Sequence, residues 1–314
     1  MPSSTPHVIV LVGPTASGKT SVSLHLAHLL SAEIISADSR QIYRYLDIGT
    51  AKPTPEERLN VPHHFVDEVP PDKEFNAGEF GVRGREVIEE IFSRGRVPLV
   101  VGGAGLYVQS LIDGFFEGPG ADWEYRKILE ERIQAGELEE LISELRRVDP
   151  VLADRIDVTK PRRIIRALEV YHTTGKPLSV LQKESRIAVN FAPLFFGLDW
   201  ERKELYRRVD ARCEEMLRNG LLDEIARLEQ MGFDRSLNAL RTVGYAEGFA
   251  FRNREITYEE MVRLFKQNSR RYAKRQMTWF KRDARISWIK MKEGISPLEV
   301  AEGILHEIQD SGRM

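Results

Sequence analysis

Short apolar runs that alternate with helically periodic segments dominate the first part of the chain. The runs at 8–12, 32–37, 96–101 and 195–200 are short and continuous, which is typical of strands buried on both faces. The segment 21–30, directly after the first run, has apolar residues at helical spacing. Because strands and helices alternate, we predict an α/β fold with a parallel sheet flanked by helices.

The pattern changes between about 118 and 195, where charged amphipathic helices replace the apolar runs. The clearest cover 123–134, 138–147 and 162–172, and breaks fall at Gly136, at Asp149-Pro150 and at 175–177. We therefore expect an all-helical subdomain over 118–194, inserted into a catalytic core formed by 1–117 and 195–314. Helices over about 201–219, 221–231 and 257–283 complete that core.

Composition places the protein among ordinary globular chains. It has 314 residues, of which 42% are hydrophobic and 30% charged, and its formal net charge is −2. The lone Cys213 excludes an internal disulfide, and there is no tight Cys/His cluster to hold zinc. The start lacks a basic region, and no apolar run approaches the ~20 residues that span a bilayer. We expect a cytoplasmic protein that does not enter membranes and does not bind nucleic acid indiscriminately.

A phosphate-binding loop follows the first predicted strand and precedes the first predicted helix. It consists of Gly13, Pro14, Thr15, Ala16, Ser17, Gly18, Lys19 and Thr20, which match G-x-x-x-x-G-K-[ST]. The glycines let successive backbone N–H groups and the helix N-terminus face one anion. Lys19 adds a positive charge, and the Thr20 hydroxyl is placed to hold Mg²⁺. The predicted ligand is a di- or triphosphate.

A carboxylate, Asp38, ends the second predicted strand, and Ser39, Arg40 and Gln41 follow it. Open parallel sheets bind ligands at this edge. Asp38 has three possible roles: a cap for the turn, a ligand of a Mg²⁺-bound water, or a general base. Opposite a diphosphate cradle, the base is the role that we favour.

A second turn, at 102–107, is rich in glycine and follows the third predicted strand. It is interpreted either as a tight strand-to-helix turn or as a place where the backbone closely approaches a substrate.

Two basic clusters lie outside the predicted sheet. Arg162, Arg163 and Arg166 fall within about one helical turn, while Ile164, Ile165 and Leu168 occupy its buried side. Such a face suits RNA backbone, or else it is a solvated face that pairs with acids. The segment 258–285 carries nine positive and three negative charges, with Tyr272, Trp279 and Phe280 interleaved. We expect its charge to be functional and its aromatic residues to be mostly structural.

These residues together resemble the bacterial tRNA dimethylallyltransferases, a family of enzymes that prenylate adenosine 37 beside the anticodon. The similarity runs nearly end to end. It is carried by GPTASGKT (13–20), DSRQIY (38–43), DIGTAKP (47–53), PHHF (62–65), VGG (101–103), RIIRALE (163–169), VGY (243–245) and AKRQMTWF (273–280).

The resemblance implies a P-loop kinase-like core and transfer of a dimethylallyl group from dimethylallyl diphosphate to N6 of adenine in tRNAs that read codons beginning with U. Asp38 would accept the N6 proton, Lys19 and Thr20 with Mg²⁺ would neutralise the leaving diphosphate, and Arg241 would border the substrate channel. The implied tRNA-binding residues are Asp38, Ser39, Arg40, Gln41, Ala104, Arg126, Arg162, Arg163, Ile164, Ile165 and Arg166. Ala104 stands where many relatives have Thr or Ser, and Ala246 where some have a basic residue. We expect a monomer.

Other functions fit parts of this pattern. A small-molecule or nucleotide kinase would use the same loop to bind ATP, but it would not need the helical insertion or the basic C-terminal helix. A prenyltransferase acting on free adenine nucleotides would likewise not need a tRNA-facing insertion. A nucleic-acid-binding switch protein without bond-making chemistry would leave Asp38 without a role.

Overall fold

The computed structural model describes residues 5–114, 118–184, 189–310 and 312, and these fall into two compact units. One unit comprises 1–112 together with 189–314, and the other comprises 113–188. The predicted core boundary at 117 lies outside the described residues. The predicted resumption of the core at 195 falls inside a strand that begins at Ala192.

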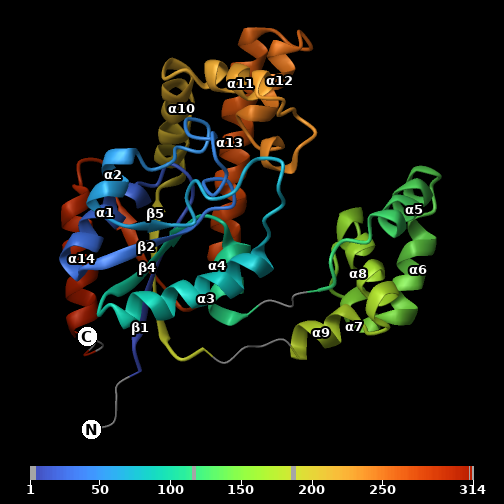
Figure 1. The fold of residues 1–314 in the computed structure, drawn as a ribbon, viewed down its shortest axis with the longest axis horizontal. Coiled ribbons are helices and arrows are strands. Elements are labelled where there is room, and N and C mark those ends of the chain that lie inside the picture. Colours follow the sequence, from blue (N-terminus) through green and yellow to red (C-terminus); the bar gives the residue numbers. More distant parts are fainter. Residues whose placement is uncertain (1–4, 115–117, 185–188, 311, 313–314) are drawn as a thin grey trace. The chain divides into compact units, whose positions relative to one another are not determined.

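A six-stranded parallel sheet forms the centre of the larger unit, in the order β3-β2-β4-β1-β5-β6 (Figure 1). The strands are β1 (His7–Val12), β2 (Ala32–Ala37), β3 (His63–His64), β4 (Val97–Gly102), β5 (Ala192–Trp200) and β6 (Ile286–Met291). All the strands are parallel, so their carboxyl ends meet at one edge, which is where open α/β sheets bind ligands. The predicted α/β class with a parallel sheet is therefore confirmed.

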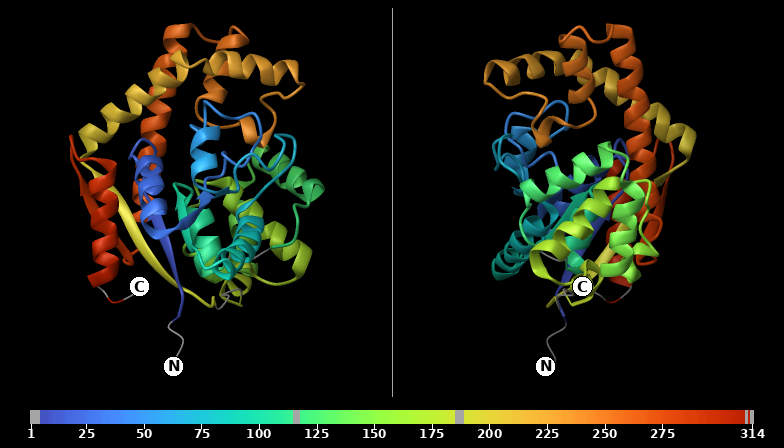
Figure 2. Two further views of the ribbon diagram at one scale, coloured as in Figure 1. Left: turned by 60° about the vertical axis from the view of Figure 1, so that its left-hand side comes forward. Right: turned by 90° about the vertical axis from the view of Figure 1, so that its right-hand side faces the viewer.

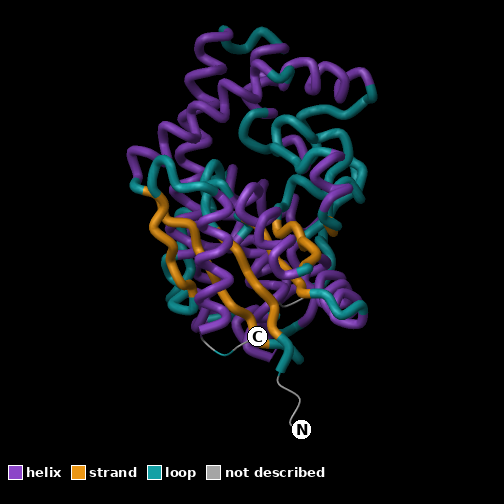
Figure 3. The backbone as a smooth tube through the Cα atoms, turned by 90° about the vertical axis from the view of Figure 1, so that its left-hand side faces the viewer, coloured by secondary structure: helices purple, strands orange, loops and turns teal. Residues whose placement is uncertain are grey.

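Helices cover both faces of this sheet; Figure 3 draws the helices in purple and the strands between them in orange. The helices of the larger unit are α1 (Lys19–Leu30), α2 (Pro55–Asn60), α3 (Ala77–Ser93), α4 (Gly105–Asp113), α10 (Arg202–Arg218), α11 (Leu221–Gln230), α12 (Tyr245–Arg252), α13 (Tyr258–Phe280) and α14 (Pro297–Asp310), with a 3₁₀ turn at Asn238–Leu240. Figure 2 shows α10 and α13 extending past the carboxyl ends of the strands.

Alternation along β1 divides the core between the two faces. Val8, Val10 and Val12 point into one hydrophobic cluster, whereas Ile9 and Leu11 point into another. The first cluster includes side chains of α3, α4, α10 and α13, and the second includes those of α1 and α14. All five side chains are fully buried, which explains why the strand appears in the sequence as an uninterrupted apolar run.

The smaller unit is all helical and has a hydrophobic core of its own. It contains α5 (Trp123–Gln134), α6 (Leu138–Val148), α7 (Pro150–Ala153), α8 (Pro161–Thr174) and α9 (Leu178–Glu184). Leu129, Leu141, Leu145 and Ile164 are fully buried at its centre. A Pro at the first position of α8 and Gly175 in the left-handed conformation after its last turn mark the ends of that helix.

The structure contains elements that the sequence analysis did not predict, among them β3, β6 and the helices α3, α12 and α14, and one predicted helix ends earlier than expected. β3 and β6 were not predicted: β3 has only two residues, and in β6 polar Ser287 and Lys290 interrupt the apolar pattern. The basic helix ends at Phe280 rather than at 283 because the chain must turn there to enter β6, which pairs in parallel with β5. Pairing of each β6 residue with the β5 residue 91 positions earlier overrides the local helical pattern.

Candidate active site

The phosphate loop joins β1 to α1 at the carboxyl edge of the sheet. Gly18 precedes α1 with φ +93, a left-handed conformation that glycine adopts without steric cost, and Lys19 begins the helix. No acidic residue occupies the first turn of α1. The positive end of the helix dipole is therefore unopposed there by a local carboxylate, as anion binding requires.

Three side chains from distant parts of the chain hold this loop. Gln276 on α13 accepts the backbone N–H of Thr15 at 2.8 Å and donates to the carbonyl of Gly103 at 3.0 Å. The Trp200 indole donates to the Ser17 carbonyl at 2.9 Å. Arg208 donates to the Ala16 carbonyl at 2.9 Å, and its guanidinium lies 4.3 Å from the Trp200 ring centre. These bonds preorganise the cradle.

Lys19 lies among other charges at the base of the site. Its Nζ donates to the Pro14 carbonyl at 2.7 Å. Burial, together with the positive charge of Arg212, lowers the pKa of Lys19 to about 7, and the negative charge of Asp38 opposes this shift in part. An ammonium group surrounded in this way favours an incoming polyanion, because the anion would restore its ordinary charge.

A cavity of about 340 Å³ opens beside the loop. Among the residues that the structure describes, five cations and a single carboxylate, that of Asp38, line it. The cations are Lys19, Arg40, Arg212, Arg241 and Arg275. This charge ratio favours a ligand that carries several negative charges.

An apolar section of the cavity wall comes from α10 and α13. Val209, Met216 and Phe265 line it, and Val243 adds to it from the segment before α12. Cys213 also faces this section, and burial raises the pKa of its thiol to about 11, so that it is an inert, protonated group near neutral pH. The cavity therefore combines an anion cradle with room for a small hydrocarbon group.

Asp38 acts as a turn cap and also faces the cavity. Its Oδ1 accepts the backbone N–H groups of Arg40 at 2.8 Å and Gln41 at 3.4 Å. Its Oδ2 has no hydrogen-bond partner in the part of the chain that the structure describes. The cap role and a role toward a ligand are thus compatible, because each uses a different oxygen.

Arg212 is a cavity residue that the sequence reasoning missed. It lies on α10 between Val209 and Cys213, both of which are buried. Within the described ranges it makes no hydrogen bond or ion pair, and burial lowers its pKa while the charge of Asp38 counteracts this. A charged residue at the edge of the buried stripe of a helix is the signal that would have indicated it.

Most of the predicted site residues of the larger unit come together. Thr15, Lys19, Thr20, Asp38, Ser39, Arg40, Gln41 and Arg241 all line the cavity. Ala104 is not among the described lining residues; it precedes α4, where its N–H donates to the Ala37 carbonyl at 3.2 Å and its side chain packs against the core. The structure thus places Ala104 in the strand-to-helix turn.

The four arginines of the helical unit that the resemblance places at the tRNA fall into two kinds. Arg126 and Arg166 donate to the carboxylate of Glu169, with shortest distances of 2.7 and 2.8 Å. Burial raises the pKa of Glu169, but the hydrogen bonds from these two arginines outweigh burial and lower it. Arg162 and Arg163, which lie on α8 like Arg166, are exposed. They are therefore the arginines of α8 that have their charge available to a partner.

Ile164 and Ile165 lie in the core of the helical unit, with 0% and 6% of their surface exposed. Their predicted place on a tRNA-binding surface applies to their backbone at most, since their side chains pack against the other helices.

Ion pairs neutralise part of the charge of the basic segment 258–285. The pairs are Arg263 with Glu260, Lys266 with Glu214, Arg270 with Asp210, Lys281 with Asp199 and Arg285 with Asp283. Tyr272 and Arg275 instead face the cavity, while Phe280 is buried and Trp279 is 38% exposed. The charge of this segment therefore reaches the site mainly through Arg275.

The fold and this cavity define a phosphate-loop protein of the α/β class whose site combines basic side chains with an apolar wall. The chain belongs to the IPP transferase family: a family model of that description matches residues 41–283, and a model described as isopentenyl transferase matches residues 6–74. The resemblance inferred from the sequence is thereby confirmed. Among the described residues, none of the helices is long and apolar enough to cross a membrane.

Relatives cover nearly the whole chain. It is 44% identical to tRNA dimethylallyltransferase 2 of Geotalea uraniireducens over 93% of this chain and 94% of that protein. It is 41% identical to the tRNA dimethylallyltransferase of Acetivibrio thermocellus over 98% of both.

Solved structures agree with these relatives. The crystal structure of the full-length tRNA isopentenylpyrophosphate transferase from Bacillus halodurans matches with a TM-score of 0.71 and 37% identity over 98% of both chains. A eukaryotic dimethylallyltransferase acting on tRNA matches with a TM-score of 0.82 and 27% identity over 98% of this chain and 80% of that one.

Proposed function

We propose that the protein transfers the dimethylallyl group of dimethylallyl diphosphate to N6 of adenosine 37 in tRNAs that read codons beginning with U, and that it releases diphosphate. It does so in the cytoplasm, as a monomer. The observation that carries this proposal is that one cavity brings together a phosphate loop, an apolar wall and, among the described residues, one carboxylate, of which only Oδ1 accepts hydrogen bonds.

The diphosphate of the donor binds to the loop, with Lys19 and Arg212 beside it. Charge builds on the leaving diphosphate as the allylic C–O bond breaks, and fixed cations stabilise that charge more strongly than they stabilise the ground state. The dimethylallyl group lies against Val209, Met216 and Phe265. This wall keeps water away from a carbon that gains positive charge.

The acceptor adenine enters the cavity from the side of Asp38. Its N6 forms a bond to the allylic carbon as the bond from that carbon to the diphosphate oxygen breaks, and N6 loses a proton. The free Oδ2 of Asp38 takes this proton. To reach such a cavity, the adenine must leave its stacked position in the RNA, which single-stranded loops permit at low cost.

The protein side chains fit a Mg²⁺ ion only when the diphosphate of the substrate supplies further oxygen ligands. Among the described residues no group of three or more His, Cys, Asp or Glu side chains is placed to hold a metal ion. The Thr20 hydroxyl borders the cradle, and Mg²⁺ commonly binds through one or two protein oxygens together with phosphate oxygens and water. We propose that Thr20 and the donor hold Mg²⁺, which supplies further charge neutralisation for the leaving diphosphate.

Label transfer tests the proposal. The purified protein is incubated with Mg²⁺, labelled dimethylallyl diphosphate and one of four acceptors: an unmodified tRNA with adenosine 37, the same tRNA with guanosine 37, AMP, or none. Nucleosides are then analysed by mass. We expect label only in the first tRNA, as N6-prenyladenosine. Label in AMP would contradict the tRNA assignment, and phosphoryl transfer from added ATP without prenyl transfer would establish the kinase instead.

A further inference from the structure

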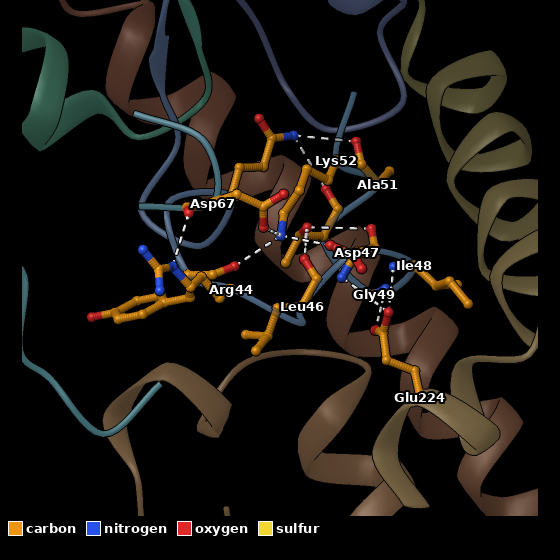
Figure 4. Close-up of polar contacts among 12 residues, drawn as sticks. Arg44, Leu46, Asp47, Ile48, Gly49, Ala51, Lys52, Asp67 and Glu224 are labelled. Carbon is orange, nitrogen blue, oxygen red and sulfur yellow. Dashed lines mark hydrogen bonds and ion pairs between the residues drawn. The ribbon is translucent and has the colours of Figure 1, made fainter. Parts of the chain in front are cut away.

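The segment from Asp47 to Lys52 forms one wall of the cavity and is anchored at both ends (Figure 4). Gly49 and Thr50 line the cavity directly. Two residues in or beside this segment, Tyr45 and Ala51, have φ of +70 and +45, conformations that such residues rarely adopt. A loop with strained backbone at both of its ends relaxes unless contacts elsewhere hold it.

The carboxylate of Glu224, on α11, supplies the anchor at one end. Its Oε2 accepts the backbone N–H groups of Asp47 at 2.9 Å and Ile48 at 2.8 Å, and its Oε1 accepts that of Gly49 at 3.1 Å. Three successive N–H groups that converge on one anion form a nest of the kind that binds phosphate, but here the anion is a side chain of the protein itself. Glu224 is 2% exposed and makes no ion pair within the described ranges.

Tyr245 closes the anchor from the other side. Its hydroxyl donates to Glu224 Oε1 at 2.6 Å, and its ring is fully buried. A Cβ placed on Gly49 would lie 2.5 Å from that ring, so the loop backbone packs directly against it. Burial, followed by the charge of Glu224, raises the pKa of Tyr245 well above its ordinary value, so the phenol stays a donor.

Hydrogen bonds from Lys52 and Gln41 connect this segment to neighbouring parts of the site. The buried Lys52 ammonium donates to Asp47 Oδ1 at 2.6 Å and to the carboxylate of Asp67. The Gln41 side chain donates to the carbonyls of Thr50 at 3.3 Å and Ala51 at 3.2 Å. The backbone N–H of Gln41 in turn reaches Asp38 Oδ1. The loop is thus connected to the turn that holds Asp38.

We propose that Glu224 is a positioning residue for the acceptor side of the site. It touches no reacting atom; it holds the loop 47–50 against the cavity and, through Gln41, steadies the turn that orients Asp38. This inference rests on the proposed function. The diphosphate cradle is built by β1, α1 and Gln276 and shares none of these bonds, so loss of the Glu224 charge should change reaction with the acceptor and leave donor binding intact.

Replacing the carboxylate by an amide tests this division. In Glu224→Gln one carboxylate oxygen becomes an NH₂ group. This group is itself a donor and cannot accept the hydrogen bonds that the oxygen accepted. The matched control is Glu229→Gln on the same helix. The Glu229 carboxylate accepts a hydrogen bond from Arg252 at 2.6 Å, and neither residue lines the cavity. Tyr245→Phe removes one of the four donors and keeps the anion. For each variant, three quantities are measured well below its melting temperature: kcat with tRNA, KM for both substrates, and hydrogen–deuterium exchange of the amides of 47–49.

We expect kcat of Glu224→Gln to fall at least tenfold, with KM for dimethylallyl diphosphate within twofold of wild type and exchange at 47–49 at least tenfold faster. Tyr245→Phe should lie between wild type and Glu224→Gln, and Glu229→Gln should match wild type. Wild-type kcat in Glu224→Gln, or equal losses for donor and acceptor, would overturn the positioning role.

Failure of the proposed function would show separately. If the wild-type protein itself transferred no label, diphosphate affinity and amide exchange would still decide the inference. Faster exchange at 47–49 with unchanged diphosphate affinity would support it, and unchanged exchange would overturn it.

Discussion

Donor binding should be coupled to the protonation of Lys19. In the free protein the pKa of Lys19 is lowered to about 7 by burial and by Arg212. At pH 8 about one tenth of the Lys19 ammonium is then charged, so binding of a diphosphate that restores the charge takes up about 0.9 proton per site. By linkage, the affinity for the donor should fall by about tenfold per pH unit as the pH rises from about 7.5 to 9.

The pH dependence that Lys19 gives to the stability of the free protein has the opposite sign to that of donor affinity. An unfolded chain holds the Lys19 proton up to the ordinary lysine pKa of 10.5, whereas the folded chain releases it near 7. The unfolded state therefore binds more protons between these values, and this group's contribution to stability rises with pH in that window. Donor affinity weakens over the same range, so the two measurements check each other.

Titration calorimetry with dimethylallyl diphosphate at pH 8, in two buffers of different ionisation enthalpy, measures the proton uptake directly. Lys19→Met should abolish the uptake and weaken binding, while the exposed Lys203→Met on α10 should retain both. Absence of proton uptake in the wild-type protein, or equal uptake in Lys19→Met, would refute the reasoning.

Other predictions concern the cradle and the helical unit. Gly103→Ala places a Cβ 2.1 Å from the Gln276 amide nitrogen. In urea titrations it should lower the free energy of unfolding by roughly 1–3 kcal/mol, and it should weaken donor binding. Unchanged donor affinity would count against Gln276 as a support of the cradle. Arg166→Ala takes a partner from buried Glu169 and should cost roughly 1–3 kcal/mol of stability. Arg163→Ala should leave stability within about 0.5 kcal/mol and reduce the salt dependence of tRNA binding by about one counterion, and an unchanged slope would remove it from the interface.

The phosphate loop and the main strands were predictable because their signals are local. In β1 both faces are buried, so the apolar run is continuous, and the loop motif sits between that run and a periodic helix. Asp38 was predictable for the same reason, since it directly follows β2.

Features that depend on distant partners were not predictable. β6 is set by pairing with β5, and its polar residues hide the strand pattern. Arg212 looks like one more charge on a helix until α10 is packed over the cavity. Glu224 has an unremarkable helical position, and its three N–H donors lie 175 to 177 residues away. The sequence does not encode such contacts in any local spacing.

The central claim is that Asp38 and the phosphate loop act on one reaction in one cavity. Single-turnover transfer by Asp38→Asn tests it most directly, because the amide oxygen of asparagine preserves the cap on the Arg40 N–H while the free oxygen is lost as a base. The account predicts a single-turnover rate, at saturating donor and tRNA, that is lower by roughly 10²- to 10⁴-fold. A rate close to that of the wild-type protein would contradict it.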